Sequence, residues 1–372
     1  MAGRRIYLVA SSGYPNYGDE FLAGQWLRRL ARTEPDAEVW LDCPNPGGAE
    51  LLLGHLHPHV RFTDTLFRIA WAVPTEDAAE AVEFGRTAAR QPGFGAPHRA
   101  AGVELLHTVD LVHVLGGGYL NAIWPRHAAL LGAAATMAED FDRPVAATGQ
   151  GLLPALLPAE ALTEVTKAYT VVDVRDAGSR ALLGGGNVTQ TGDDCLLDLG
   201  RESFDQRESV SVMMCLQSDL LDGDVEQVVE SARATLTAWG VDGSKVGYVE
   251  GIPGQDRVVF DRISEQFPGM RFYPFTEVWR DGLPARRGQR WITTRPDLHV
   301  LAAATGAWGV AFPVHAGYDD LAHRALVDQG SRWAIGTPGE AAPETHGEAG
   351  FGSALEGLTT AKRELAERIY AR

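Results

Sequence analysis

Short apolar runs alternate along this chain with glycine-bearing turns and amphipathic stretches. The first run, residues 6–10, is β-branched and aromatic, as in a buried parallel strand. A loop rich in Ser, Gly, Pro and Asn follows, and then Phe21, Leu22, Trp26 and Leu30 recur at helical spacing behind an acidic first turn. The opening of the chain therefore predicts a strand, a glycine-bearing loop and a helix.

The same pattern returns throughout the chain. Residues 110–115, 144–151 and 170–176 read as buried strands that end in glycine or polar turns, and after the polar stretch 200–208 a second series begins. Its strands are predicted at 210–215, 245–249, 271–275, 290–294 and 309–312, with helices at 224–239, 256–267 and 300–305. Residues 86–99, with Gly93, Gly95 and Pro97, predict a surface loop. The pattern predicts two doubly wound Rossmann-like α/β domains, 1–200 and 209–345, facing a cleft, and an amphipathic helix at 353–372 that packs back.

Composition excludes several classes of protein. The chain has 372 residues, of which 45% are hydrophobic and 22% charged, so it is globular, and its formal charge of −16 argues against nucleic acid as a partner. Three distant cysteines predict reduced thiols in a cytoplasmic protein, and no apolar run is long enough for a transmembrane segment. Lysine is rare: Lys167, Lys245 and Lys362 are the only three.

The sequence lacks nucleotide-binding motifs, and its one metal-like pattern, H-x-H-x-H at His55, His57 and His59, has no nearby carboxylate or cysteine cluster and is interpreted as a polar connection. It contains neither G-x-G-x-x-G with a distant acid nor a phosphate-binding G-x-x-x-x-G-K-[ST] loop. The acidic pair Asp193 and Asp194 has no second acidic cluster and is interpreted as a turn cap. We therefore expect no metal and no cofactor.

Several loops together resemble the polysaccharide (ketal) pyruvyltransferase family. The matching stretches are residues 16–20 (NYGDE), 116–118 (GGG), 149–151 (GQG), Arg175-Asp176 with Ser179, 191–193 (TGD) and 295–303 (RPDLHVLAA). The resemblance extends over residues 6–306 and implies two domains similar to GT-B glycosyltransferases. It also implies transfer of an enolpyruvyl unit from phosphoenolpyruvate to two hydroxyls of a sugar. The products would be a cyclic pyruvate ketal, on a surface glycan precursor or glycoside, and phosphate.

The resemblance also assigns roles to residues. His299 is expected to be the catalytic acid, since its pKa lies near working pH, and Asp19 is expected to be the base or to orient the sugar. Arg295 and Arg175, with Ser179, are expected to grip the donor, because arginine binds carboxylate and phosphate bidentately. The acceptor is expected on the N-terminal domain and the donor on the C-terminal domain. The acceptor-side loop residues are Asn16, Tyr17, Gly116, Gly117, Gly118 and Gln150.

Two other functions stay open. Asp297 stands where the family usually carries a histidine, which favours a non-catalytic glycan-binding relative. A GT-B-type glycosyltransferase that uses a nucleotide sugar would need a carboxylate for the ribose, and Glu250 or Glu277 is available. Without the resemblance, the residues alone favour Asp19 as a helix cap, Arg175 as a surface ion pair and His299 as a helix-start histidine. The sequence leaves the oligomeric state open.

Overall fold

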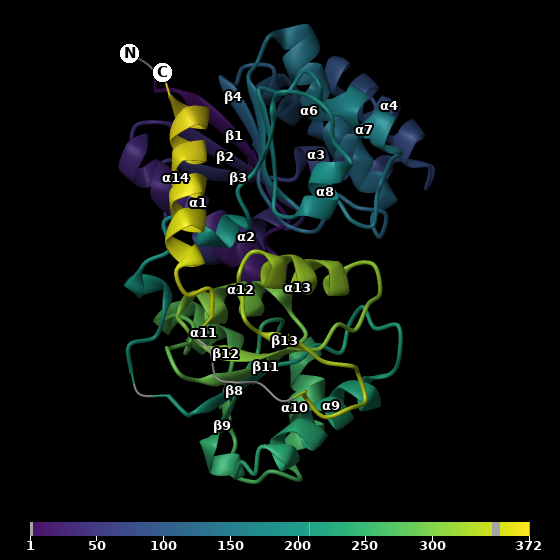
Figure 1. Ribbon diagram of the computed structural model, residues 1–372. Coiled ribbons are helices and arrows are strands. Elements are labelled where there is room, and N and C mark those ends of the chain that lie inside the picture. The colour runs from purple at the N-terminus through teal and green to yellow at the C-terminus, as the bar shows by residue number, and fades with distance from the viewer. Residues whose placement is uncertain (1–2, 208, 344–349, 372) are drawn as a thin grey trace. The chain divides into compact units, whose positions relative to one another are not determined.

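The computed structural model describes residues 3–207, 209–343 and 350–371, which separate into two compact units (Figure 1). The N-terminal unit comprises the described residues of Met1–Tyr14, Asp19–Asp198 and Ala361–Arg372, and the C-terminal unit those of Pro15–Gly18 and Leu199–Thr360. The predicted domain boundary at 345 lies outside the described residues, as do residue 208 of the predicted linker and residue 372 of the predicted last helix. Each unit is built on one parallel sheet.

The N-terminal sheet has the order β3-β2-β1-β4-β5-β6-β7, and every neighbouring pair is parallel. The strand order reverses between β1 and β4, which is the point where open α/β sheets bind ligands outside the carboxyl ends of their strands. The strands are β1 (Arg5–Val9), β2 (Glu38–Asp42), β3 (Val60–Thr63), β4 (Leu111–Val114), β5 (Val145–Gln150), β6 (Val171–Val174) and β7 (Val188–Gln190).

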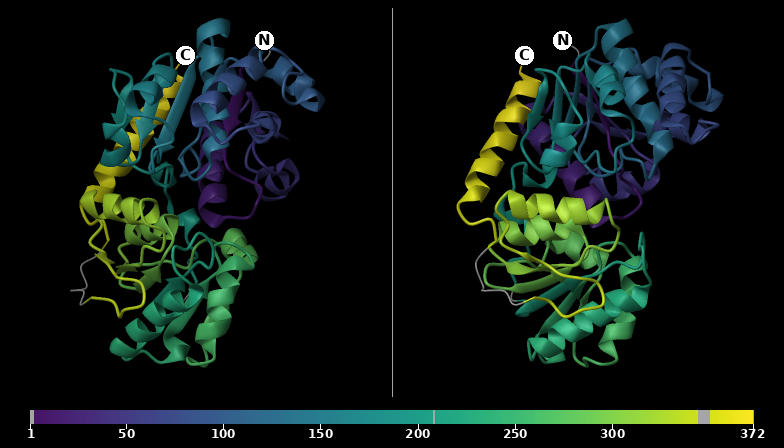
Figure 2. Two further views of the ribbon diagram at one scale, coloured as in Figure 1. Left: turned by 90° about the vertical axis from the view of Figure 1, so that its right-hand side faces the viewer. Right: turned by 45° about the vertical axis from the view of Figure 1, so that its right-hand side comes forward.

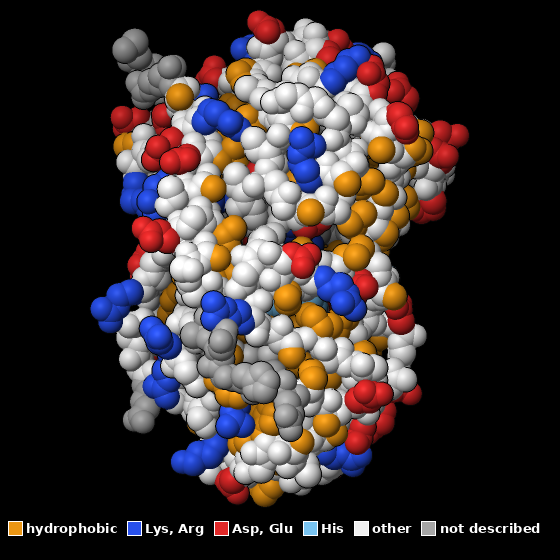
Figure 3. All heavy atoms as spheres, in the orientation of Figure 1, with side chains coloured by type: hydrophobic (Ala, Val, Ile, Leu, Met, Phe, Trp, Pro, Cys, Tyr) orange, Lys and Arg blue, Asp and Glu red, His pale blue; other side chains and the backbone are white. Residues whose placement is uncertain are grey.

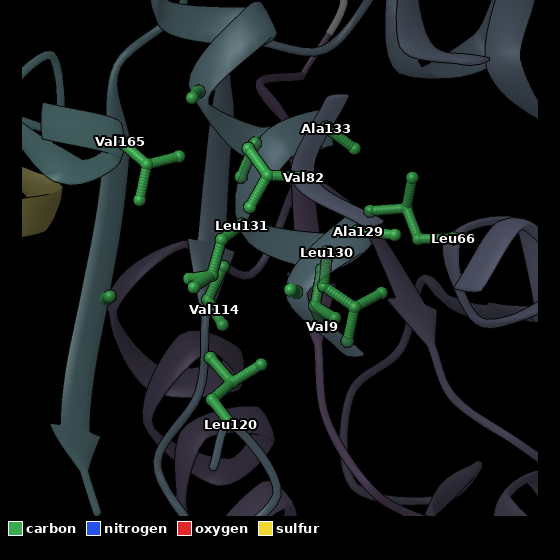
Figure 4. Close-up of a cluster of buried hydrophobic side chains, with 14 of the residues drawn as sticks. Val9, Leu66, Val82, Val114, Leu120, Ala129, Leu130, Leu131, Ala133 and Val165 are labelled. Carbon is green, nitrogen blue, oxygen red and sulfur yellow. The ribbon is translucent and has the colours of Figure 1, made fainter. Parts of the chain in front are cut away.

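Helices cover both faces of this sheet, and α14 lies along the face that α1 also covers (Figures 1 and 2). The opposite face carries the main apolar core, in which Val9 and Val114 of the sheet pack with Val82 and Leu130 of the helices (Figure 4). The helices are α1 (Tyr17–Thr33), α2 (Pro46–Leu53), α3 (Thr65–Ala72), α4 (Ala78–Arg90), α5 (Ala100–Leu106), α6 (Ala128–Phe141), α7 (Ala159–Thr166) and α8 (Ala177–Ala181).

The C-terminal sheet repeats the same winding with the order β10-β9-β8-β11-β12-β13, again parallel throughout. Its order reverses between β8 and β11. The strands are β8 (Val212–Cys215), β9 (Val246–Val249), β10 (Arg271–Tyr273), β11 (Arg290–Thr293), β12 (Trp308–Ala311) and β13 (Ala334–Ile335). The helices are α9 (Val225–Ala238), α10 (Gln255–Ser264), α11 (Phe275–Asp281), α12 (Pro296–Ala304) and α13 (Asp319–Asp328). The last helix, α14 (Ala354–Tyr370), begins in this unit, and its residues from Ala361 on belong to the N-terminal unit.

Two local predictions were wrong. The helix expected at 300–305 begins at Pro296, because proline at the first helical position needs no N–H partner and already has a helical φ. Residues 86–99 are not all loop, since α4 continues to Arg90 and a 3-10 turn covers Pro97–Arg99. Ala81, Gly85, Ala88 and Ala89 of α4 are buried, and this burial was not evident from the local sequence.

Both acidic and basic side chains lie on the face shown in Figure 3, with several of the basic ones toward its lower left. Within the described residues, no helix combines the length and the apolar character needed to cross a bilayer. The architecture of this chain is two parallel-sheet, Rossmann-like α/β domains, as the sequence predicted.

Candidate active site

The first candidate site lies where the strand order of the N-terminal sheet reverses. Residues 116–118, the first glycine loop, follow β4, and residues 149–151, the second glycine loop, end β5. The two loops are joined because Gly151 N donates to Gly117 O at 2.9 Å. Gly117 has a φ of +131°, a conformation that side chains rarely adopt, so glycine is required there. The joined loops bring two stretches of bare backbone side by side at the carboxyl edge of the sheet.

An acid and an arginine flank this backbone. A Cβ atom at Gly117 would lie 3.8 Å from Oδ1 of Asp19, and one at Gly151 would lie 2.5 Å from Nε of Arg175. We call Gly117 and Gly151 the glycine floor. Asp19 is in the first turn of α1, whereas Arg175 follows β6, with its guanidinium 3.6 Å from Asp193. The structure thus brings together Asp19, Arg175 and both glycine loops, which the sequence proposed separately.

The side chains of Gln150 and Ser179 are committed to holding this edge in place. Gln150 Nε2 donates to three carbonyl oxygens, those of Val114, Leu115 and Thr148, at 2.8–3.1 Å. Ser179 Oγ donates to Asp176 at 2.8 Å and accepts from the N–H of Leu152 at 2.9 Å. Ser179 is fully buried and supports the loop through these bonds, and its contact with the donor stays a prediction.

Beneath the two glycine loops lies a buried charge cluster that the sequence did not predict. Lys362 of α14 reaches Asp173 and Asp194 at 2.8 Å each, and all three side chains have no exposed surface. Burial alone would raise the pKa of Asp194, but the charge of Lys362 and the hydrogen bonds outweigh it and hold the pKa below its ordinary value. Burial lowers the pKa of Lys362, but the two carboxylates outweigh this effect and raise it, so Lys362 and Asp194 are both charged.

Glu20 is a second buried acid, on the same turn as Asp19. Its Oε1 accepts from the N–H of Gly13 at 2.6 Å, and no partner for Oε2 is found within the described residues. Burial raises the pKa of Glu20 to about 8, although the hydrogen bond from Gly13 opposes the shift. Glu20 is therefore neutral at pH 7, close to the loop that follows β1.

The second candidate site lies where the C-terminal sheet reverses, and it contains Arg295. Arg295 precedes α12 and is 6% exposed. Its Nε lies 3.1–3.2 Å from both carboxylate oxygens of Asp256, and its NH2 lies 2.5 Å from Asp256 and 2.9 Å from Asp219. The two carboxylates more than balance the guanidinium. The predicted donor contact of Arg295 therefore has to compete with two acids of the chain itself.

His299 is enclosed in the interior of the C-terminal unit. Its Nε2 lies 2.6 Å from Ser331 Oγ, its Nδ1 lies 3.1 Å from Nδ1 of His323, and its ring stacks on Trp333. Burial first, and then the neighbouring His323, lower the pKa of His299 well below its ordinary value. The imidazole is neutral and has no exposed surface, so its surroundings favour a structural role. Its role as the acid stays a prediction.

Asn16 and Tyr17 belong to the short segment Pro15–Gly18 of the C-terminal unit. Tyr17 N donates to Gly251 O at 2.9 Å, and the Tyr17 ring packs edge-on against Trp279 at 6.2 Å. A Cβ at Gly18 would collide with the carboxylate of Asp297, which shows how closely this segment approaches the start of α12. The carboxylate of Asp297 therefore lies directly beside Gly18.

The carboxylates proposed for a nucleotide ribose are engaged elsewhere. Glu250 accepts from the N–H groups of Gly254 and Phe275 through its two oxygens, at 3.0 and 3.1 Å. Glu277 is paired with Arg271 at 2.9 Å and with Arg207 at 3.4 Å. Neither geometry favours a ribose contact.

Sequence reasoning missed Asp173 and Lys362 because they act through each other, 189 positions apart along the chain. It missed Glu20 because the burial of this acid is not evident from the local sequence. The single available signal was that Lys362 is a lysine in a chain whose other cations are almost all arginine. Asp193 was interpreted correctly as a cap, since it accepts from the N–H of Cys195 at 2.8 Å. The same interpretation was wrong for Asp194, whose carboxylate instead joins the buried cluster with Lys362. Among the described residues, no group of three or more His, Cys, Asp or Glu side chains is arranged to hold a metal ion.

Comparison with solved structures shows the fold. The chain is similar to a UDP-N-acetylglucosamine 2-epimerase, with TM-score 0.58 and 12% identity over 100% of this chain and 98% of the other. It is also similar to a putative UDP-N-acetylglucosamine 2-epimerase from Listeria monocytogenes (TM-score 0.54, 9% identity, 99% and 89% covered). A third similar structure is MurG from Acinetobacter baumannii (TM-score 0.50, 12% identity, 97% and 90% covered).

Comparison at the level of sequence is more specific. No curated protein matches the chain. A family model, polysaccharide pyruvyl transferase, matches residues 16–237, which is more than half of the chain. That range includes Asp19, both glycine loops and Arg175, so the glycine floor and both residues that flank it lie inside the match. This chain belongs to the polysaccharide pyruvyl transferase family.

Proposed function

We propose that this chain transfers a pyruvyl group from phosphoenolpyruvate to two hydroxyls of a sugar, forming a cyclic ketal on a surface glycan precursor or a glycoside. The observation that carries the proposal is the family match over residues 16–237, within which Asp19 and Arg175 flank the glycine floor. The proposal places the reaction in the cytoplasm, in keeping with three cysteines that lie far apart in the sequence and have no metal or redox spacing.

Arg175 is the proposed contact for the anionic donor. Phosphoenolpyruvate carries a phosphate and a carboxylate, and a guanidinium binds either group through two parallel N–H donors without losing its charge. The backbone of the glycine floor adds to this, because glycine lets a ligand approach main-chain N–H groups that a side chain would shield. Arg175 and the glycine floor are adjacent, so one anion can meet both.

Asp19 is the proposed base for the sugar. In the reaction, one hydroxyl gives up its proton as its oxygen bonds to C2 of phosphoenolpyruvate, the C2–C3 double bond opens, and the methylene carbon gains one proton. The second hydroxyl oxygen then bonds to C2 as the C2–O bond to phosphate breaks, and its proton leaves with the phosphate or the base. A carboxylate at the crevice can accept a hydroxyl proton in this sequence. Asp19 meets that requirement by position, since it borders the glycine floor across from Arg175.

The donor is tested by titrating purified full-length chain with phosphoenolpyruvate and, separately, with uridine diphosphate, following thermal stability and heat of binding. Binding of phosphoenolpyruvate, with phosphate release when a panel of glycosides is added, is the expected result. Binding of uridine diphosphate alone would instead identify a nucleotide-sugar enzyme. Binding of glycosides without turnover would identify a non-catalytic relative.

A matched pair of variants tests the role of Arg175. Arg175→Ala should weaken phosphoenolpyruvate binding by about 10- to 100-fold, the equivalent of roughly 1.5–3 kcal/mol for a charge-assisted contact. Arg180→Ala is the control, because Arg180 lies on the adjacent α8 and donates to the carbonyl of Leu183. Equal binding by wild type and Arg175→Ala would remove Arg175 from the donor site.

A further inference from the structure

We propose that Lys362 is a positioning residue of the candidate active site, and that the C-terminal helix α14 is therefore part of the machinery of the N-terminal unit. Its ammonium group fixes the first and second glycine loops through the two carboxylates beneath them. The placement of the loops stands on contacts within the N-terminal unit. The identity of the ligand that the loops meet rests on the proposed function.

The ammonium group is saturated by three acceptors. Nζ of Lys362 lies 2.8 Å from Asp173 Oδ2, 2.7 Å from the carbonyl oxygen of Gly192 and 2.8 Å from Asp194 Oδ1. An ammonium has three N–H donors, so each donor has one acceptor. The side chain is fully buried, so the three protein acceptors replace all the water that would otherwise bind the ammonium group.

Each carboxylate in turn holds one glycine loop. Asp194 Oδ2 accepts from the N–H of Gly116 at 3.1 Å and from Thr148 Oγ1 at 2.6 Å. Asp173 Oδ2 accepts from the N–H of Gly149 at 3.0 Å. Without Lys362, two buried carboxylates would face each other without a counter-charge, and they would ionise or remain in place only at a high cost in free energy. The positions of both loops therefore depend on one cation.

The composition of the chain supports the choice of lysine at this position. The other two lysines, Lys167 and Lys245, are exposed, whereas Lys362 has no exposed surface. A guanidinium presents its donors in a planar fork and cannot direct three N–H groups from one atom toward three acceptors. Arginine is the usual cation of this chain, so the buried lysine marks a position where the geometry excludes arginine.

A second contact ties α14 to the same cluster. The hydroxyl of Tyr370 lies 2.7 Å from Nδ1 of His113, whose Nε2 lies 2.9 Å from Oγ1 of Thr148. Thr148 donates to Asp194, so the network closes on the carboxylate that Lys362 also contacts. Burial lowers the pKa of His113 to about 3, which keeps its ring neutral and the network free of a second buried cation. Lys362 and Tyr370 lie eight positions apart, on one face of the helix.

The test compares Lys362→Met and Lys362→Arg with Leu365→Ala in the full-length chain. Leu365 is buried on the same helix face, and its truncation destabilises α14 without touching the charge cluster. Hydrogen exchange, measured by mass spectrometry well below each melting temperature, follows peptides that contain the two glycine loops. Both Lys362 variants should exchange about tenfold faster than wild type at these loops, with Leu365→Ala within about twofold.

Lys362→Arg keeps the buried charge, so it decides the question if Lys362→Met does not fold. Loops that exchange at the wild-type rate in Lys362→Arg, or equally fast in Leu365→Ala, would overturn the proposal. A second measurement titrates phosphoenolpyruvate, for which Lys362→Arg should bind about tenfold more weakly while Leu365→Ala binds as wild type. Failure of wild type itself to bind phosphoenolpyruvate would count against the proposed function alone, because the exchange measurement needs no ligand.

Discussion

Glu20 should make the stability of the N-terminal unit fall as pH rises, and a single substitution should remove this dependence. Burial raises the pKa of Glu20 from 4.5 to about 8 in the folded chain. Below pH 4.5 the acid is protonated in both the folded and the unfolded state, so its burial carries no ionisation penalty. Between these two pKa values the folded state binds one more proton than the unfolded state, and stability therefore falls as pH rises.

The size of the effect follows from the width of that window. A difference of one bound proton changes the free energy of unfolding by about 1.4 kcal/mol per pH unit. Across the window from 4.5 to about 8, the loss has an upper limit of roughly 5 kcal/mol. Glu20→Gln resembles the protonated acid in shape, and its amide oxygen can still accept from Gly13. The variant should therefore match wild type near pH 5 and exceed it by a few kcal/mol at pH 8.

Urea unfolding followed by tryptophan fluorescence at several pH values between 5 and 9 measures this difference. Burial also raises the pKa of Asp42 to about 7 and that of Asp319 to about 6, but both titrate equally in wild type and variant and cancel in the comparison. Glu104→Gln is the control, since Glu104 is exposed on α5. A Glu20→Gln curve with the same pH slope as wild type, or with lower stability at pH 8, would refute the reasoning.

Two further substitutions test the C-terminal unit. His299→Ala should lower its stability by about 2–4 kcal/mol, because it removes the stacking on Trp333 and the bond to Ser331, and urea unfolding measures the loss. A variant of wild-type stability that no longer turns over would instead support the acid role of His299. Asp256→Ala should cost about 3–5 kcal/mol by leaving Arg295 without its closest carboxylate, whereas Asp256→Asn should cost less; comparable losses for both would contradict this.

Much of the fold could be predicted from the sequence because its strands are continuous apolar runs. The run at residues 110–115 became β4, Leu111–Val114, since a parallel strand buried on both faces has no polar alternation to obscure it. Residues 50–100 did not yield to the same reasoning. Their helices pack through small residues such as Gly85, whose added Cβ would lie 2.0 Å from the carbonyl oxygen of Ala129. That complementarity is visible only when both helices are in place.

The same distinction between local signals and distant contacts applies to the candidate site. Glycine loops after strands are local signals, and they marked the first and second glycine loops correctly as backbone at the carboxyl edge of the sheet. The partners that hold these loops come from Asp173, Asp194 and Lys362, and the last two are 168 positions apart. No local pattern relates residues at that separation. The sequence therefore predicted the two glycine loops of the candidate site but not the buried side chains that hold them.

The two arginines that the sequence grouped as one donor clamp now require different experiments. Arg175 lies in the N-terminal unit beside the glycine floor, and Arg295 lies in the C-terminal unit, where Asp256 and Asp219 both contact its guanidinium. Removing Arg295 would leave two acids close together without their cation, so a loss of activity in Arg295→Ala would by itself say nothing about donor binding. Arg295→Lys retains the charge while losing the planar fork. If it keeps wild-type stability and wild-type affinity for phosphoenolpyruvate, then Arg295 serves the fold, and the donor site rests on Arg175.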